Sequence, residues 1–241
     1  MKRYGLIGKT LKHSFSQQYF SQKFAQLGLS HTHSYQNFEL PAIAAIAAVL
    51  SSGVAGLNVT IPYKESVLGY LDAVTDTVKA VGACNCIQFQ NGRAVGHNTD
   101  VVGFSQSLQP LLEPQHQQAL VLGTGGAAKS VQYVLQQLGI DCKTVSHSGK
   151  GVMAYADVTT DVIGNHLLLV NTTPLGMHPH TDACPDIDYN AITPQHLLYD
   201  LVYNPAETLF LRRGKEAGAI IKNGYEMLVL QAEESWRIWN E

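Results

Sequence analysis

The sequence has little cysteine and no long apolar run. Its four cysteines are spaced neither as a disulfide framework nor as a paired-CxxC metal site, so we expect reduced thiols. No apolar stretch approaches the roughly 20 residues that a membrane span needs. The first residues do not resemble a signal peptide, because Lys2 and Arg3 lead directly into a strand-like run. These features predict a cytoplasmic protein that does not associate with membranes.

Charge of one sign is also scarce. The formal net charge is -3 and the basic residues are dispersed, so the sequence lacks the electrostatic footprint of a nucleic-acid binder. Two histidine pairs, His31 with His33 and His178 with His180, could suggest a metal site. Because no acidic or cysteine partners accompany them at ligand spacing, we expect no metal. A small molecule is therefore the expected partner.

Apolar runs of strand length alternate with amphipathic stretches of helix length, which is typical of βα units around a largely parallel sheet. The sequence therefore predicts an α/β fold. In the first hundred residues we expect strands near 4–8, 34–40 and 56–61, with helices over 16–29 and 42–51 and a third beginning near Tyr63. Asn91-Gly92, between two strand-like runs, predicts a tight hairpin.

The pattern changes near residue 100. A buried strand over 119–122 precedes Gly123-Thr-Gly-Gly-Ala-Ala128 and a helix, which is the strand, glycine turn and helix of a dinucleotide-binding unit. We therefore expect two domains: residues 1–99, and a Rossmann-like domain at 100–224. The final segment, 225–241, is expected to return to the first domain.

Within the glycine turn, Gly123 permits the tight bend, Gly125 lets the backbone approach a pyrophosphate, and Ala128 allows close helix packing. The pyrophosphate would lie at the helix N-terminus, where unpaired N–H groups favour an anion. A glycine turn without a ligand is the alternative. The next strand ends in Ser146-His147-Ser148, which has no carboxylate for a ribose hydroxyl. This favours NADP over NAD, although a neutral histidine is a weaker phosphate partner than arginine.

Polar side chains also interrupt the first domain. Ser14 and Ser16 precede a helix, where capping is the alternative role. Asn58 and Thr60 lie two residues apart on a strand, so they share one face, and simple surface exposure is their alternative. The sequence thus places polar groups beside two predicted elements of the first domain.

Lys64 lies at the predicted start of a helix, where the helix dipole disfavours a cation. Asp100 follows Asn98-Thr99 and could simply cap the next helix. A pair formed by Lys64 and Asp100 would give both residues a role.

Together these segments resemble the shikimate dehydrogenase family, and the match runs over nearly the whole chain in the family's order. The matching stretches are Ser14 with Ser16, Asn58–Lys64, Gly82–Asn85, Asn98–Asp100, Gly123–Ala127, Asn171–Met177, Tyr203–Pro205, Asn223–Gly224 and Gln231–Ala232.

The resemblance implies reversible NADPH-dependent reduction of 3-dehydroshikimate to shikimate, in chorismate biosynthesis, with Lys64 and Asp100 as the catalytic pair. In this hypothesis the nicotinamide delivers hydride to the C3 carbonyl, and Lys64 donates a proton to the developing alkoxide. The implied shikimate-binding residues are Ser14, Ser16, Thr60, Asn85, Asp100, Tyr203 and Gln231. The implied cofactor-binding residues are Gly123, Thr124, Gly125, Gly126, Ala127, Ser146, His147, Ser148, Thr172, Leu201 and Gly224.

Two other functions are compatible with these residues. A quinate/shikimate dehydrogenase with relaxed substrate or cofactor choice would share most of them. A non-catalytic relative would keep the binding site and lose its reaction, but the presence of both Lys64 and Asp100 argues against it. The expected partners are shikimate and 3-dehydroshikimate, and the expected state is a monomer or homodimer.

Overall fold

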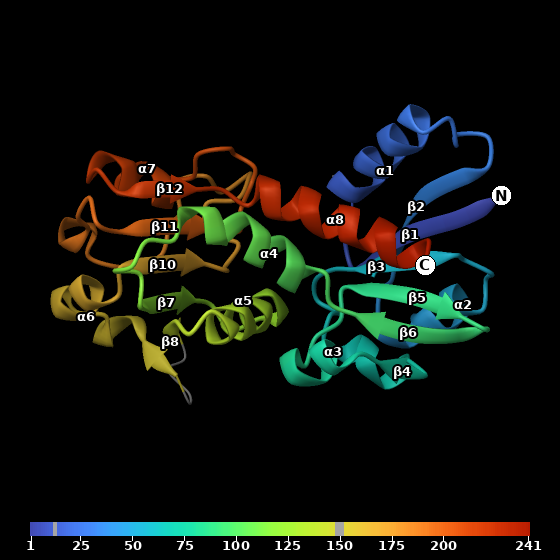
Figure 1. Cartoon of the computed structure of the whole chain (residues 1–241), viewed down its shortest axis with the longest axis horizontal. Helices are drawn as coiled ribbons and strands as arrows, with labels where there is room; N and C mark the ends of the chain where they lie inside the picture. The colour runs from blue at the N-terminus through green and yellow to red at the C-terminus, as the bar shows by residue number, and fades with distance from the viewer. Residues whose placement is uncertain (12–13, 148–151) are drawn as a thin grey trace. The chain divides into compact units, whose positions relative to one another are not determined.

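The computed structural model describes residues 1–11, 14–147 and 152–241, and its secondary structure is mixed α/β (Figure 1). The predicted fold class is confirmed. The chain forms two compact units: the first unit is Met1–Thr99 with Ala232–Glu241, and the second unit is Asp100–Gln231. One boundary falls inside the last helix, α8 (Tyr225–Trp239), so that residues up to Gln231 group with the second unit.

The first unit has a six-stranded sheet in the order β2-β1-β3-β5-β6-β4. Strand β1 pairs in parallel with β2 and β3, whereas β5 runs antiparallel to β3 and β6. The antiparallel pairs arise because Asn91 (φ 50°) and Gly92 (φ 78°) form the predicted two-residue hairpin turn between β5 and β6. The strands are β1 (Lys2–Gly8), β2 (His33–Glu39), β3 (Gly56–Val59), β4 (Ala73–Val74), β5 (Cys86–Gln90) and β6 (Arg93–His97).

Two helix predictions in the first unit were wrong in detail. The alanine-rich segment forms a 3-10 turn followed by a short α-helix, and the helix expected near Tyr63 is a 3-10 helix that begins at Ser66. Lys64 lies in the preceding turn, because its carbonyl accepts a hydrogen bond from the Cys84 backbone N–H (2.8 Å) and closes no helical turn. The helices are α1 (Phe15–Gln26), η1 (Ile43–Ala45), α2 (Ile46–Leu50), η2 (Ser66–Tyr70) and α3 (Asp76–Val81), besides α8.

The second unit has a wholly parallel sheet in the order β12-β11-β10-β7-β8-β9. This is the doubly wound order, in which the direction of winding reverses between β7 and β10. Its strands are β7 (Gln118–Leu122), β8 (Asp141–Ser146), β9 (Met153–Ala154), β10 (Leu168–Asn171), β11 (Leu197–Asp200) and β12 (Ile220–Lys222). Its helices are α4 (Asp100–Leu108), η3 (Gln109–Leu111), α5 (Gly126–Gln137), η4 (Tyr155–Asp157), α6 (Thr160–Asn165), η5 (Tyr189–Ala191) and α7 (Leu209–Glu216), with the start of α8.

Helices cover both faces of this parallel sheet. Val121 and Val170 pack in a cluster with residues of α4 and α5, whereas Leu120 and Leu169, on the opposite face, pack with residues of α6 and α7. The central strands are therefore buried on both sides, as their continuous apolar runs predict.

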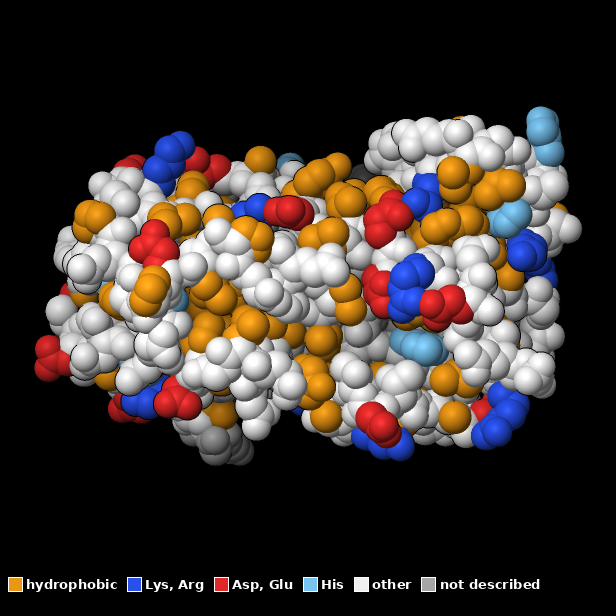
Figure 2. Space-filling model, viewed as in Figure 1, with side chains coloured by type: hydrophobic (Ala, Val, Ile, Leu, Met, Phe, Trp, Pro, Cys, Tyr) orange, Lys and Arg blue, Asp and Glu red, His pale blue; other side chains and the backbone are white. Residues whose placement is uncertain are grey.

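Charge is mixed on the surface. On the face drawn in Figure 2, the basic side chains of the described residues lie singly or beside acidic ones and do not gather in one patch. Among the described residues, no helix is both long and apolar enough to cross a membrane.

Candidate functional site

The glycine turn of the second unit follows β7, at the edge where ligands bind in doubly wound sheets. Gly123 has a φ of 122°, and an added Cβ would lie 2.4 Å from the Thr172 Oγ1 atom, so only glycine fits. Thr172 follows β10, the strand across the switch point, and its hydroxyl donates to the Leu122 carbonyl (2.8 Å). Gly123 and Thr172 thus meet where the winding reverses.

The start of α5 has the geometry of an anion site. Gly125 is the N-cap residue, and an added Cβ would meet nothing within 4 Å, so the space over its backbone is open. Thr124 and Gly125 are exposed, while Gly126 and Ala127 open the helix. Ala128 is fully buried, as the close packing of helix and strand requires. The first N–H groups of α5 can therefore donate hydrogen bonds to a phosphate group.

Ser146 is the last residue of β8, and His147 follows it. Strand β8 pairs directly with β7. The His147 ring lies 4.7 Å from the Tyr155 ring, at an interplanar angle of 35°. Burial raises the pKa of Tyr155 to about 12. Ser148, the third predicted residue here, lies outside the described residues.

A buried carboxylate at the same edge was missed by the sequence interpretation. Asp200 ends β11, is 0% exposed, and accepts hydrogen bonds from the Asn171 Nδ2 (2.9 Å), the Val202 N–H (3.0 Å) and the Thr208 Oγ1 (2.5 Å). Burial raises its pKa to about 6 against the opposing effect of these bonds. The signal that could have found it is an acidic residue at the end of an apolar strand, because a buried carboxylate needs partners.

Gly224 holds the entrance to α8 against the segment that follows β11. An added Cβ would lie 2.1 Å from the Leu201 carbonyl oxygen, and the Gly224 N–H donates to the Val202 carbonyl (3.2 Å). Tyr203, two residues after Leu201, is half-buried, and burial raises its pKa. The segment that contains Leu201 and Tyr203 therefore lies against Gly224.

Asp100 and Gln231 are buried on the two helices at the boundaries of the second unit. Asp100 is the first residue of α4, where the helix dipole favours a carboxylate, and not the preceding cap position. The Gln231 Nε2 donates to the Leu228 carbonyl (2.8 Å). Gly103 lets α4 approach α8, since an added Cβ would lie 2.5 Å from the Met227 carbonyl oxygen.

In the first unit, Ser14 and Ser16 have different surroundings. Ser14 caps α1, where its Oγ accepts from the Gln17 N–H (3.2 Å), so the capping role is present. Ser16 is buried, and its side chain interacts with the Tyr35 hydroxyl, where it opposes the rise in pKa that burial causes. That hydroxyl donates in turn to the Asn58 Oδ1 (2.8 Å). Asn58 is therefore buried and bonded, which rules out simple surface exposure as its role.

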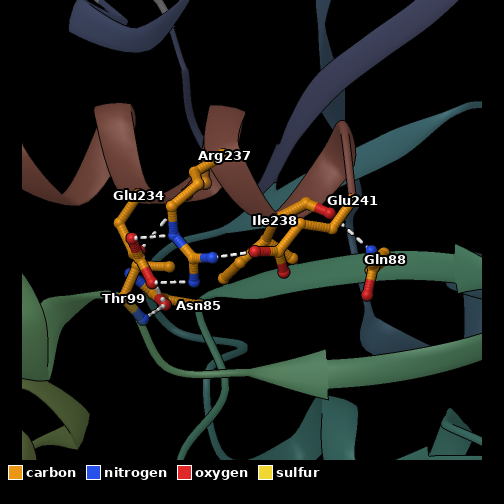
Figure 3. A network of polar contacts seen from close by, with 8 residues as sticks. Asn85, Gln88, Thr99, Glu234, Arg237, Ile238 and Glu241 are labelled. Carbon is orange, nitrogen blue, oxygen red and sulfur yellow. Dashed lines mark hydrogen bonds and ion pairs between the residues drawn. The ribbon is translucent and has the colours of Figure 1, made fainter.

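The same chain of hydrogen bonds continues to Asn85. The Asn58 Nδ2 donates to the Ser235 Oγ (2.8 Å), which lies 3.2 Å from the Thr99 Oγ1. The Asn85 Oδ1 accepts from the Thr99 N–H (2.6 Å), and the Asn85 Nδ2 donates to the Thr99 Oγ1 (3.0 Å) (Figure 3). We call this set, from Ser16 through Tyr35, Asn58, Ser235 and Thr99 to Asn85, the hydroxyl–amide network.

The end of α8 makes further polar contacts within the first unit. Arg237 makes a two-point pair with Glu234, with nitrogen–oxygen distances of 2.7 Å for each bond, and a further pair with Glu241 (Figure 3). The Gln88 Nε2 donates to the Ile238 carbonyl. The end of the helix is thereby held against β5.

Lys64 and Thr60 flank a tight turn in the first unit. The Thr60 N–H donates to the Ile7 carbonyl (2.8 Å), and its own carbonyl accepts from the Tyr63 N–H (3.0 Å). Lys64 is half-buried. Because Lys64 and Asp100 belong to different units, their pairing stays a prediction.

Within residues 1–11, 14–147 and 152–241, no group of three or more His, Cys, Asp or Glu side chains could hold a metal ion. The strand order, the glycine turn at the switch point and the open start of α5 define the class of the protein. It is an α/β protein with a Rossmann-type dinucleotide-binding unit and a second unit with a mixed sheet.

Comparison with known proteins identifies the family. Residues 6–87 match the model of the shikimate dehydrogenase substrate binding domain. The chain is 36% identical to a shikimate dehydrogenase (NADP(+)) of Carboxydothermus hydrogenoformans, over 98% of this chain and 90% of the relative. This chain belongs to the shikimate dehydrogenase family, and the resemblance seen in the sequence is confirmed.

Two solved structures are similar over almost the whole chain. The shikimate 5-dehydrogenase of Thermus thermophilus, in complex with NADP(H) and shikimate, has a TM-score of 0.85 and 30% identity, covering 99% of this chain and 93% of that one. The quinate dehydrogenase of Corynebacterium glutamicum, in complex with NAD, has a TM-score of 0.86 and 26% identity, with coverages of 99% and 93%.

Proposed function

We propose that this chain is an NADP-dependent shikimate dehydrogenase, an oxidoreductase that reversibly reduces 3-dehydroshikimate to shikimate. The observation that carries the proposal is the similarity, over nearly the full length, to curated relatives named shikimate dehydrogenase (NADP(+)). The Rossmann-type second unit agrees with it, since a dehydrogenase of this kind needs a dinucleotide site.

The cofactor is NADP, and the second unit fits it. The open space over Gly125 leaves room for a pyrophosphate at the start of α5, and Gly123 allows the tight turn against Thr172 that precedes it. Residues 123–127 would hold it through backbone N–H groups, with Ser146, His147 and Ser148 toward the 2'-phosphate. Thr172, Leu201 and Gly224 would lie around the nicotinamide. When bound, the nicotinamide supplies the hydride for the reduction.

We assign substrate binding mainly to residues of the first unit. Lys64 and four polar side chains, Ser14, Ser16, Thr60 and Asn85, would bind the substrate there. We also assign substrate contacts to Asp100, Tyr203 and Gln231. The buried hydroxyl–amide network supports this assignment, because it orients Ser16 and Asn85 before a ligand arrives. Polar groups held in this way suit a polyhydroxylated ring, each hydroxyl of which needs a partner once it leaves water.

We assign the proton transfer to Lys64. As the C3 carbonyl is reduced, negative charge develops on its oxygen, and a lysine ammonium supplies the proton that completes the hydroxyl group. Asp100 positions this ammonium and accepts a hydrogen bond from a substrate hydroxyl.

We further propose that the protein acts in the cytoplasm as a monomer or homodimer. Each of its four cysteines is a free thiol, which suits a reducing compartment.

The proposal is tested by following reduced nicotinamide absorbance with shikimate or quinate, each with NADP+ or NAD+. We expect the highest kcat/KM for shikimate with NADP+. A higher kcat/KM for quinate would instead favour a quinate/shikimate dehydrogenase. Absence of a shikimate-dependent change in absorbance with either cofactor would favour a non-catalytic binding protein.

A further inference from the structure

The Asp200 carboxylate joins three segments of the second unit. Its hydrogen-bond donors come from Asn171 at the end of β10, from Val202 in the segment after β11, and from Thr208 at the N-cap of α7. The strand register places Asn171 directly beside Asp200. A single side chain thus holds the ends of two strands and the start of a helix.

The partners of Asp200 extend this control to the neighbouring loops. The Asn171 Oδ1 accepts from the Thr173 N–H (3.0 Å) and the Thr173 Oγ1 (2.6 Å), so it shapes the chain immediately after β10. Thr172, between these two residues, is the residue that contacts Gly123. On the other side, Thr208 lies at the end of the loop that begins at Leu201 and contains Tyr203, and its hydroxyl donates to Asp200.

These loops lie at the half of the sheet that takes the nicotinamide. In a doubly wound sheet each half binds one mononucleotide, and the pyrophosphate lies at the first glycine turn. The turn follows β7, and the end of β8 lies toward the adenosine ribose, so the second mononucleotide belongs over β10 and β11. Asp200 lies beneath that position.

A core carboxylate is a costly way to fill space. Removal from water disfavours its charged form, and an apolar residue of similar volume would often give a more stable protein. Here burial is nearly complete, and all three bonds are made to backbone or side chains that shape the two loops. The role that explains this carboxylate is therefore control of loop shape.

We propose that Asp200 is a positioning residue for the cofactor, which holds the segments after β10 and β11 in the shape that the nicotinamide end of NADP requires. This inference depends on the proposed NADP site but not on the identity of the substrate. Asp200 acts through Asn171 and Thr208 and does not itself need to touch the cofactor.

The test measures NADPH binding by fluorescence titration, without substrate, together with KM values for NADP+ and shikimate. In Asp200→Ala we expect NADPH binding to weaken at least tenfold and the shikimate KM to change less than twofold. In Asp200→Asn we expect affinity within about threefold of the wild type. Its amide oxygen can still accept from Asn171 and Val202, and its NH₂ group can donate to Thr208.

The matched control is Ser107→Ala. Ser107 is also buried in the second unit, where its hydroxyl bonds α4 carbonyls and lies 2.6 Å from the Tyr199 hydroxyl, and within the described chain it makes no bond to either loop. We expect this variant to lower the melting temperature and leave NADPH affinity unchanged. Equal loss of affinity in Ser107→Ala and Asp200→Ala would overturn the proposal, because general destabilisation would explain both.

If Asp200→Ala does not fold, Thr208→Val provides the test, since it removes one of the three bonds and retains the shape of the side chain. NADPH affinity about threefold weaker supports the proposal, and unchanged affinity overturns it. Absence of shikimate turnover in the wild type would refute the proposed function while NADPH binding still tests Asp200.

Discussion

The two units hold polar groups in different ways. In the first unit, neutral hydroxyl and amide side chains bond one another in a buried network from Ser16 to Asn85. In the second unit, backbone N–H groups at the start of α5 are open, and one buried carboxylate, Asp200, shapes the loops. The difference supports the proposal that the first unit recognises its ligand with oriented side chains, and the second with backbone.

The largest expected effect concerns the first unit alone. In Lys64→Ala, turnover should fall by about 10²- to 10⁴-fold, the usual contribution of a general acid, while the KM values change far less. The control is Lys79→Ala, because Lys79 lies on the exposed face of α3 and pairs only with the exposed Asp76 among the described residues. Steady-state kinetics with shikimate and NADP+ measures both. Near-wild-type turnover in Lys64→Ala would refute its catalytic role.

The second prediction tests the ionisation of the buried Asp200 carboxyl in the second unit. The pKa of Asp200 in the folded protein, about 6, is above the ordinary value of 3.8, so ionisation of the carboxyl lowers the stability of the folded state. The free energy of unfolding should therefore fall by about 2 kcal/mol between pH 4 and pH 7 relative to Asp200→Asn. Melting temperatures of both proteins across this range check it. Parallel curves would show that burial does not raise this pKa.

The third prediction tests whether the second unit recognises its ligand with backbone. Gly123→Ala places a methyl group against Thr172 in a left-handed backbone conformation, so NADPH affinity should weaken about tenfold or more, with the shikimate KM unchanged. Gly139→Ala is the matched control, because Gly139 also has a positive φ (73°) but open space around it. Equal affinity losses in fluorescence titrations of both variants would indicate a general backbone effect.

The smallest expected effect tests the hydroxyl–amide network. Tyr35→Phe removes one hydroxyl and keeps the ring stacked on Phe20, so stability should fall by about 1 kcal/mol. Because Ser16 loses its partner, the shikimate KM should rise a few-fold while the NADP+ KM stays constant. Urea unfolding and the two KM values measure this. An equal rise in both KM values would contradict the separation between the units.

Features that depend on neighbouring residues were predicted well. The Asn91-Gly92 hairpin and the glycine turn before α5 both follow from local composition and periodicity. The turn at Lys64 could not be predicted, because it depends on a hydrogen bond to Cys84, far along the chain. Asp200 was missed for a similar reason: its role appears only when the register brings Asn171 beside it.

The first unit is discontinuous in sequence, and this affects how the protein is made. The Trp239 indole packs closely on Gly56, where an added Cβ would lie only 2.4 Å from the ring. The Trp239 Nε1 donates to the Ile87 carbonyl (3.0 Å). A ribosome synthesises the whole second unit before it reaches Ala232–Glu241. All of the second unit is therefore available to fold before the first unit gains the contacts of its last segment.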